Sequence, residues 1–468
     1  MQFLLRPPGM KRVPYHLAFC GQWEHVQSGG NKHGFIASKL FLSFFVHNRM
    51  PEKCVHRQEQ QMEKTIIEEA ENAKCWYDFL TYKTVKQHLS AKEEKDIREF
   101  IEKKAYLPLC EAWKKQQFPI GFPVKKIVNK EGTGKKRIVY SFEGDEGIFL
   151  KFVAFHLFRY DEVFCDNCYA FRRGFGVRDA IRRICSDTRA GKSYCLKADI
   201  SNYFNSIDVE LLLPGLSFVE ESDPLLYQLL EHILREKRVW QNGELIAENH
   251  GAMAGTPFSP FLANIYLMDT DWFFKNQGVL YLRYSDDILL FADTMEELRE
   301  RQQQLYSRLS ALGLTVNPEK VNIYAPGEPL EFLGFCYRNG EIDLSDNTKR
   351  KVKAKMKRKA RALRRWQHKK QLSGEKAAIG FIRAMNRKFY GSMKEDPERD
   401  EFTWNRWFFP NLTVDVGLKE IDAYMQQYIR YTVTGRHYKG NYRIRYETLK
   451  EWGYRNLVHE YYEWRKLD

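Results

Sequence analysis

The sequence predicts an α+β fold, in which a central region of strands and helices is preceded and followed by helical segments. Charged and apolar residues alternate at helical spacing over residues 62–105. Between about 120 and 345, short runs of β-branched and aromatic residues alternate with helical patterns and turn residues. A strongly basic segment with a narrow apolar stripe, typical of an exposed helix, then covers residues 349–370. A chain of 468 residues is long enough for roughly two to four domains or subdomains.

The composition indicates a folded, basic protein. Hydrophobic residues make up 43% of the chain, which is enough for sizeable cores and argues against global disorder. The formal net charge of +14 favours nucleic acid as a partner, although a merely basic protein is the alternative. The nine scattered cysteines are typical of reduced thiols in a cytoplasmic protein. The apolar run at 35–46 is too short and too interrupted to span a bilayer, so we expect no membrane partner.

The two N-terminal regions differ in pattern. Residues 1–61 lack clear periodicity, so we expect an irregular extension there, unless the biological start lies at a downstream methionine. Residues 62–119 are predicted to be helical. Within them, Ser90 followed by Glu93 predicts a capping box, which marks the start of a helix.

The central region contains predicted strands, one hairpin and one amphipathic helix. The strands are expected at 136–142, 193–198, 280–284 and 288–291. A hairpin is expected between 331–337 and 341–344, because Asn339-Gly340 between them is the strongest short signal for a two-residue turn. The helix is predicted over 295–312.

Three carboxylates stand at the ends of predicted strands. Asp286 and Asp287 lie in the turn between two apolar runs, and Asp199 ends another run 87 residues earlier. Phosphoryl transfer needs charge neutralisation and alignment, which two divalent ions held by carboxylates supply. Mg²⁺ prefers such ligands. An acidic pair between strands is by itself typical of a surface turn, so the hypothesis of a metal site depends on further motifs.

Further motifs around these carboxylates resemble those of reverse transcriptases. YSDD at 284–287 resembles the YxDD box of that family, and KADISNYF at 197–204 resembles the strand that carries its first metal-binding aspartate. The segment 251–267 resembles the pattern GxPQGxxxSPxLxNxxL. YAFRRG at 169–174 resembles the YGFRPG segment of bacterial members. Each box alone is a weak signal, and their combination is a strong one.

The remaining motifs complete the family order over roughly 120–345. The basic residues between 126 and 137 resemble the fingers hairpin that holds the triphosphate. NPEK at 317–320 resembles the next motif after the acidic box, and FLGF at 332–335 resembles the primer-grip hairpin. The resemblance therefore implies a right-hand polymerase fold with fingers and palm over 120–345.

The resemblance implies roles for individual residues. The implied catalytic residues are Asp199, Asp286 and Asp287, which with Ile200 would bind two Mg²⁺ ions, or Mn²⁺ in their place. Phe204 stands where the family has an aromatic that excludes a 2′-hydroxyl, which implies a preference for deoxynucleotides. The other residues implied to bind the nucleotide are Lys126, Arg137, Arg172, Gly255 and Lys320. Those implied to contact nucleic acid are Tyr284, Phe332, Gly334, Lys353, Lys357, Arg361 and Arg436.

Specific chemistry and two departures follow from the motifs. Arg137 and Arg172 are the best candidates for phosphate contacts, with ordinary surface charge as the alternative. Lys320 is a candidate proton donor to pyrophosphate. Met253 and Ala254 replace the usual Pro and Gln of the family segment. The missing Gln removes a polar contact near the nascent base pair, so ordinary fidelity and template use are not implied.

The regions after the palm are expected to bind nucleic acid. Residues 346–400 would form a basic helical thumb, with a solvated helix face as the alternative. Residues 401–468 would form an accessory RNA-binding region, because their aromatic and basic residues suit stacking and phosphate contact. The alternative for this tail is a small helical domain whose aromatic residues are core.

The tail at 431–457 resembles bacterial "unknown group" reverse transcriptases, several of which act in defence against bacteriophage. This resemblance implies a cytoplasmic bacterial enzyme that uses dNTPs to copy a dedicated, structured non-coding RNA into a DNA product. The alternatives are a mobile-element enzyme, a non-catalytic RNA-binding scaffold, and protein-primed or untemplated synthesis. The retron triplet Val433-Thr434-Gly435 is present but far downstream of the palm, so we interpret it as coincidental. The lone CxxC at 165–168 does not predict zinc.

Overall fold

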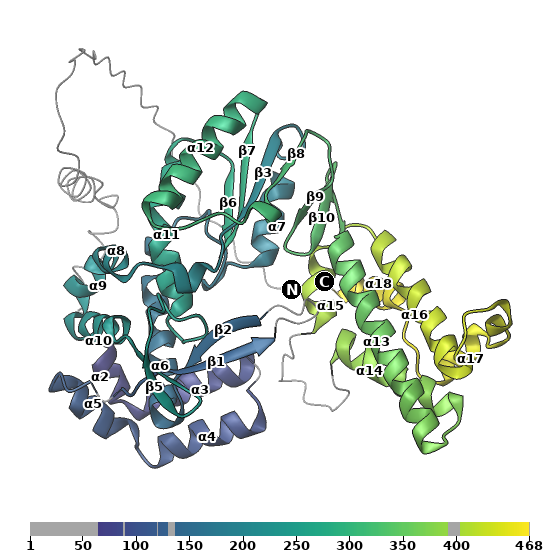
Figure 1. Ribbon diagram of the computed structural model, residues 1–468, viewed down its shortest axis with the longest axis horizontal. Coiled ribbons are helices and arrows are strands. Elements are labelled where there is room, and N and C mark those ends of the chain that lie inside the picture. The colour runs from purple at the N-terminus through teal and green to yellow at the C-terminus, as the bar shows by residue number, and fades with distance from the viewer. Residues whose placement is uncertain (1–63, 88, 119, 130–135, 392–402, 468) are drawn as a thin grey trace, which may run out of the picture. The chain divides into compact units, whose positions relative to one another are not determined.

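Helices and three β-sheets make up the described chain (Figure 1). The computed structural model describes residues 64–87, 89–118, 120–129, 136–391 and 403–467. The irregular extension expected at 1–61 lies outside the described residues. The mixture of helices and sheets confirms the predicted α+β class. No helix in the described residues is long and apolar enough to cross a membrane.

The N-terminal helices pack around a tryptophan. They are α2 (Ile66–Ala70), α3 (Ala73–Gln87), α4 (Ala91–Glu102) and α5 (Tyr106–Lys114), and all four contact α6 (Gly144–His156). The ring of Trp76 stacks on Phe152 of α6 with centroids 4.0 Å apart. The predicted capping box is confirmed, since Ser90 accepts from the Glu93 amide and Glu93 from the Ser90 amide. The prediction of helices over 62–105 is therefore confirmed for the described part of that range.

A four-stranded sheet follows these helices. β1 (Val124–Asn129) and β2 (Lys136–Ser141) form an antiparallel pair, and β4 (Arg238–Gln241) and β5 (Glu244–Ala247) extend it in the order β2-β1-β4-β5. β2 confirms the strand predicted at 136–142. Between β2 and β4 the chain forms four further helices, which are α7 (Val177–Ser186), α8 (Val209–Leu212), α9 (Ser217–Ser222) and α10 (Pro224–Arg235).

A second four-stranded sheet has the order β6-β7-β3-β8 and carries the acidic motifs. Its strands are β3 (Tyr194–Asp199), β6 (Tyr281–Tyr284), β7 (Asp287–Ala292) and β8 (Asn322–Tyr324). Both faces are covered, because Leu290 packs in the core with α11 (Ser259–Asn276) and α12 (Met295–Ala311), whereas Leu289 packs in the core with α7. Burial on both faces explains why these strands read as continuous apolar runs in the sequence.

The run predicted as one strand at 331–337 is instead two strands. β9 (Leu330–Phe332) and β10 (Phe335–Arg338) are antiparallel, and β10 also pairs with β11 (Glu341–Leu344) around the predicted Asn339-Gly340 turn. The break occurs because Leu333 and Gly334 both have positive φ, at 51° and 91°. A Cβ at Gly334 would lie 3.0 Å from Thr348 Oγ1, so glycine allows this turn to approach the next helix closely.

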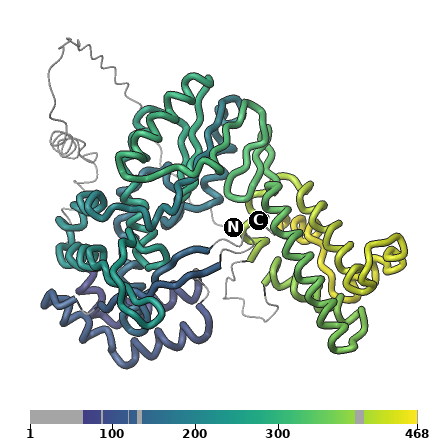
Figure 2. The backbone as a smooth tube through the Cα atoms, in the orientation of Figure 1, coloured from purple at the N-terminus to yellow at the C-terminus, as the bar shows by residue number. Residues whose placement is uncertain are grey.

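The C-terminal helices form one bundle, coloured green to yellow in Figure 2. Its long members are α13 (Asp346–Lys370), α14 (Gly374–Tyr390), α16 (Val416–Thr434) and α18 (Leu457–Leu467), with the short helices α15 (Trp404–Phe408) and α17 (Tyr446–Glu451) beside them. α16 packs against α13, α14 and α18. The helices on both sides of the predicted boundary at 400 therefore share one hydrophobic core.

Candidate active site

The three predicted carboxylates come from neighbouring strands. Asp199 ends β3, and Asp287 begins β7 directly opposite it in the antiparallel register. Asp286 precedes Asp287 in the turn, and its carbonyl oxygen accepts from the Ile200 amide at 3.1 Å. The Ile200 side chain is buried, so only its backbone carbonyl could serve an ion. The strand pairing thus brings together all four residues predicted to hold metal.

The electrostatics of this site favour a bound cation. Burial, and then the charges of Asp286 and Asp199, raise the pKa of Asp287 to about 6, although Lys197 and Lys320 oppose the shift. Burial and the charge of Asp199 also raise the pKa of Asp286. The Lys320 ammonium lies 2.5 Å from Asp199 Oδ1. Mutual repulsion of carboxylates is the physical reason why such a group binds a divalent ion.

The donor set fits divalent ions that prefer oxygen ligands. Three carboxylates and one backbone carbonyl are hard oxygen ligands of the kind that Mg²⁺ and Mn²⁺ take. In the described residues, no three acidic, His or Cys side chains already stand together as a metal-binding group.

A buried arginine, which the sequence analysis did not single out, supports the acidic turn. Arg283 has 0% of its side chain exposed and forms an ion pair with Asp271 at 2.5 Å. Tyr281 also donates to Asp271, at 2.9 Å. Arg283 Nη1 donates to Asn264 at 3.1 Å and to the carbonyl oxygen of Ser285 at 3.3 Å. The available signal was a charged residue inside the apolar run at 280–284.

The turn itself has an unusual backbone. Ser285 is buried and has a φ of 61°, in the left-handed region that non-glycine residues rarely adopt. Such conformations persist where surrounding contacts determine them, and they cluster at functional sites. The bond from Arg283 to the Ser285 carbonyl is one such contact. Tyr284, predicted to contact nucleic acid, is only half-buried beside this turn.

The segment 251–267, which resembles the pattern GxPQGxxxSPxLxNxxL, connects β2 of the first four-stranded sheet to the turn that follows β3 of the second. The Ala252 amide donates to the Phe204 carbonyl at 2.9 Å, and Ala254 accepts from the Tyr140 amide of β2 at 2.8 Å. Gly255 has a φ of 102°, and a Cβ there would lie 3.0 Å from the Tyr140 carbonyl oxygen. The predicted residue Gly255 is thus required for close backbone approach.

Ala254 and Met253 occupy the two positions where the family pattern differs. Both are buried. Asn205 Oδ1 accepts from the Ala254 amide at 2.9 Å, so Asn205 supplies a polar contact beside the position of the missing Gln. Sequence reasoning passed over Asn205, because its proximity to Ala254 arises only from the fold.

Phe204 lies in the short helical turn Tyr203–Ser206, directly after the strand that ends in Asp199. Its ring meets that of Phe171 edge-on, with centroids 6.1 Å apart. Phe171 is exposed and also has a positive φ, of 60°. The two rings therefore form an aromatic pair directly after the strand that ends in Asp199.

The structure places Arg172 differently from the prediction. Its guanidinium is buried and donates to the carbonyl oxygens of Cys165, Cys168 and Asp161 at 2.7, 3.1 and 3.0 Å. It also covers the ring of Phe175 at 4.0 Å. Carbonyl oxygens thus occupy both Nη groups, and Nε lies 3.7 Å from Asp161 Oδ2. These contacts favour a structural role for Arg172 in place of the predicted phosphate contact. The CxxC cysteines are part of this packing, and both are buried.

The other cations predicted to bind the nucleotide remain accessible. Lys126 and Arg137 lie on β1 and β2, and Arg137 is exposed. Lys126 forms an exposed ion pair with Glu143 at 2.6 Å, a weak interaction that a phosphate could replace. Lys320 reaches the site from the turn Pro318–Lys320, which the Asn317 amide joins to the Asp199 carbonyl at 2.8 Å.

The residues predicted to contact nucleic acid divide into buried and exposed groups. Phe332 and Phe335, on the two sides of the turn, are both buried in the core, so neither ring is exposed to nucleic acid. Gly334 forms the turn itself, against α13. Lys353 forms an ion pair with Glu420 of α16. Lys357 and Arg361, one and two turns further along α13, are exposed, as is Arg436.

Residues 128–337 match the family described as reverse transcriptase, RNA-dependent DNA polymerase. This segment is a reverse transcriptase domain. The match confirms the predicted family resemblance and, with the mixed fold, the predicted right-hand polymerase class. It contains Asp199, Asp286, Asp287 and Lys320, which the strand pairing assembles.

Relatives of the reverse transcriptase domain include two bacterial proteins. The Retron Ec86 reverse transcriptase of Escherichia coli is 26% identical over 106 residues, which are 22% of this chain and 33% of that protein. The Retron Ec83 reverse transcriptase of Escherichia coli is 30% identical over 122 residues, which are 25% of this chain and 38% of that protein. The matched region thus spans a little over a third of these relatives at most.

A solved structure was also matched. It is the apo telomerase of Candida tropicalis truncated from its C-terminal domain, at 13% sequence identity and a TM-score of 0.40. The match covers 52% of this chain and 60% of that one.

The triplet Val433-Thr434-Gly435 lies at the end of α16, where Gly435 has a φ of 76°. Arg364 of α13 donates to the Val433 carbonyl oxygen at 3.1 Å. The triplet is therefore far from the palm in sequence but lies against the first helix that follows it. From the sequence, the triplet is interpreted as coincidental because it lies far from the palm. In the fold, however, it contacts α13, the helix that directly follows the palm.

Proposed function

We propose that this protein is an RNA-directed DNA polymerase that joins deoxynucleotides by two-metal phosphoryl transfer. The observation that carries the proposal is the direct pairing of Asp199 with Asp287 across β3 and β7, with Asp286 in the turn between β6 and β7. The family match of residues 128–337 supports it. A pair of divalent ions would align the attacking and leaving oxygens and neutralise the charge that develops on the phosphoryl group.

The chain's own residues divide the remaining work. Asp199, Asp286, Asp287 and the Ile200 carbonyl would hold the ions. Arg137 and Lys126 on the β1–β2 hairpin would bind the triphosphate, and Lys320 would give a proton to the leaving pyrophosphate. Phe204 would lie under the sugar and exclude a 2′-hydroxyl. The exposed cations of α13 would contact the phosphates of the duplex.

We further propose that the template is a dedicated non-coding RNA and that DNA synthesis serves bacterial defence against bacteriophage, in the cytoplasm. The resemblance of the tail supports this role. The similarity to retron enzymes keeps a retron-like element as the second candidate. A non-catalytic RNA scaffold is disfavoured, because a cluster of repelling carboxylates is costly to a fold that makes no use of them.

The decisive experiment uses the protein with its co-purified nucleic acid. With dNTPs and Mg²⁺ the wild type is expected to make DNA whose sequence identifies the RNA template. The double variant Asp286→Ala/Asp287→Ala should make none yet retain the RNA. Asp293→Ala, which removes an exposed carboxylate at the far end of β7, is the matched control and should remain active. DNA synthesis by the double variant would refute the site.

Two further measurements separate the parts of the proposal. Mg²⁺ should raise the melting temperature of the wild type but not that of the double variant, which reports metal binding without activity. In cells challenged with phage, the double variant should lose protection. Equal protection by the wild type and the double variant would instead support the hypothesis of a non-catalytic RNA scaffold.

A further inference from the structure

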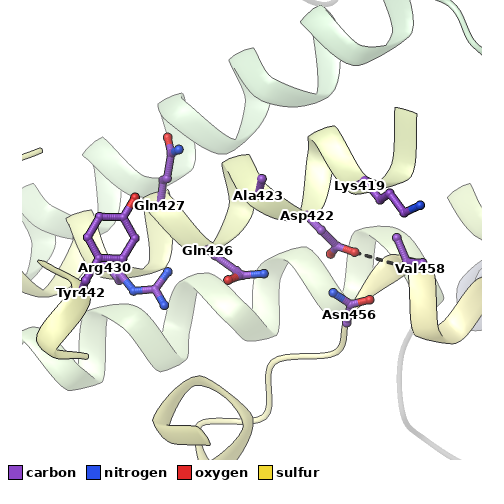
Figure 3. A pocket seen from close by; sticks show the side chains of 9 residues that line it. All are labelled: Lys419, Asp422, Ala423, Gln426, Gln427, Arg430, Tyr442, Asn456 and Val458. Atoms are coloured by element: carbon purple, nitrogen blue, oxygen red, sulfur yellow. Dashed lines mark hydrogen bonds between the residues drawn. The ribbon is translucent and has the colours of Figure 1, made fainter. Parts of the chain in front are cut away.

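A polar hollow lies beside α16 in the C-terminal bundle, and none of the three predicted carboxylates lines it. It has a volume of about 440 Å³, which is in the range of pockets that bind small molecules. Asp422, Gln426 and Arg430 line it at a spacing of four residues, so they share one face of α16. Figure 3 shows these side chains projecting toward Asn456, with Tyr442 at one end.

Arg430 is a mostly buried residue without an acidic partner, and its two Nη groups are not fully enclosed. Its residue is only 8% exposed, and its Nε donates to the Ile444 carbonyl oxygen at 2.9 Å. In the described residues, neither Nη1 nor Nη2 has a hydrogen-bond partner. Burial lowers the pKa of Arg430, yet a guanidinium stays charged at neutral pH because its ordinary pKa is so high.

The carboxylate that lines the same hollow is already used by other donors. Asp422 accepts from the Tyr454 hydroxyl at 2.8 Å and from the Leu457 and Val458 amides, each at 3.0 Å. These three donors use the carboxylate to fix the start of α18. Solvent reaches the two Nη groups of Arg430, so water can satisfy this side of the guanidinium. The Nη groups are therefore available to an anion that replaces this water in the hollow.

The aromatic and amide side chains that line the hollow suit a ligand with a planar ring that carries polar groups on its edge. Tyr442 is 66% exposed, and the Arg430 guanidinium lies 5.4 Å from its ring centroid. Gln427 makes no hydrogen bond within the described residues, and Gln426 uses only its Nε2, in a long bond of 3.4 Å to Tyr454. Free amide groups hydrogen-bond the edges of bases, and an exposed tyrosine offers a face on which a base can stack.

We propose that this hollow binds one unpaired nucleotide, with its phosphate on the two free Nη groups of Arg430, its base on Tyr442 and the base edge on Gln426, while Gln427 lies at the rim. The proposal deepens the proposed function and rests on it in one respect, because the nucleotide would belong to the RNA that the polymerase copies. A free nucleotide has the same chemistry, and the test distinguishes the two sources.

The test measures binding by the full chain in the Asp286→Ala/Asp287→Ala background, freed of nucleic acid. The probes are a fluorescent single-stranded RNA decamer, the four nucleoside 5′-monophosphates, the corresponding nucleosides and inorganic phosphate. Arg430→Gln should weaken RNA binding about tenfold or more, the usual effect of losing a charge-assisted hydrogen bond. Arg443→Gln, which removes an exposed arginine beside Tyr442, is the matched control and should change binding less than threefold.

A second pair of variants guards against misfolding of Arg430→Gln. Gln427 is exposed, so Gln427→Glu and Gln427→Lys should both fold, and they should respectively weaken and strengthen RNA binding. If the monophosphates bind in an Arg430-dependent way and the decamer does not, the site takes free nucleotides. Two results would overturn the nucleotide pocket. One is that inorganic phosphate competes for the site as well as a nucleoside monophosphate does. The other is that neither the Arg430 substitution nor the charge of the side chain at position 427 affects binding. Wild-type synthesis on a primed template, measured separately, shows whether the polymerase proposal stands in that case.

Discussion

Arg283 Nη1 donates to the carbonyl oxygen of Ser285 at 3.3 Å, from a side chain that is completely buried. The bond connects the interior of the palm to the turn that carries Asp286 and Asp287. The Arg283 guanidinium also donates hydrogen bonds to Asp271 and Asn264 of α11. The acidic turn is thus anchored to a helix as well as to its own hairpin, and a change in this network should move the carboxylates.

We expect Arg283→Met to lose both stability and activity. Breaking a buried ion pair leaves Asp271 uncompensated and typically costs about 3–5 kcal/mol, which chemical denaturation would measure. The double variant Arg283→Met/Asp271→Leu removes both charges and should recover most of the free energy of unfolding. Its kcat should stay low, because nothing then holds the Ser285 carbonyl. Full recovery of kcat in a restored fold would contradict the positioning role.

The sequence was sufficient for much of the site but not for Arg283 or Asn205. The strand ends at Asp199 and Asp287 follow from local apolar runs, and the motif order places them in one sheet. Arg283 is held by Asp271 and Asn264 of α11, 12 and 19 positions away, and Asn205 meets Ala254, 49 positions away; local patterns do not encode these contacts. Arg172 lies in a family motif, and only the fold shows that carbonyl oxygens already surround it.

The fold was predictable to a similar extent. Helix starts with capping residues, such as Ser90 and Glu93, and the Asn339-Gly340 turn are determined locally. The division of 331–337 into two strands depends on Gly334 meeting Thr348, which is a tertiary contact. The shared core of the helices on either side of residue 400 depends likewise on the packing of α16 on α13 and α14.

Lys320 is expected to affect both the chemical step and the requirement for metal. Its ammonium lies 2.5 Å from Asp199 Oδ1, where it competes with a cation for the same oxygen. Lys320→Gln should therefore lower the Mg²⁺ concentration needed for half-maximal activity. It should also lower kcat by about 100-fold, the lower end of the range for loss of a general acid. Lys192→Gln, at an exposed site before β3, should change neither quantity.

Phe204 is expected to set the choice of sugar. Its ring packs edge-on against Phe171 just after the strand that ends in Asp199, so in the proposed site truncation would open space next to the sugar of an incoming nucleotide. Phe204→Ala should raise the relative kcat/KM for ribonucleotides by at least about tenfold, the usual effect of a changed steric contact in a pocket. Phe171→Ala should change this ratio less. An unchanged ratio in Phe204→Ala would remove the gate from the proposed site.

Lys83 in α3 is expected to make stability depend on pH. Burial, and then the charge of Lys151, lower its pKa from 10.5 to about 8. Between pH 8 and 10.5 the folded chain therefore binds fewer protons at this site than the unfolded chain, so its contribution to stability rises with pH across that window. Below pH 8 the full cost of the buried charge remains. Lys83→Met should therefore raise the free energy of unfolding at pH 7 by on the order of 1 to 3 kcal/mol.

The advantage of Lys83→Met should shrink as the pH rises from 8 and disappear near 10.5. Urea denaturation at pH 7, 9 and 10.5 would measure it. Lys92→Met, at an exposed position of α4, is the matched control and should change stability by less than about 0.5 kcal/mol at each pH. A Lys83→Met protein that is less stable than the wild type at pH 7 would show that the ammonium stabilises α3 through its contacts, among them the Phe79 ring at 5.5 Å, by more than its burial costs.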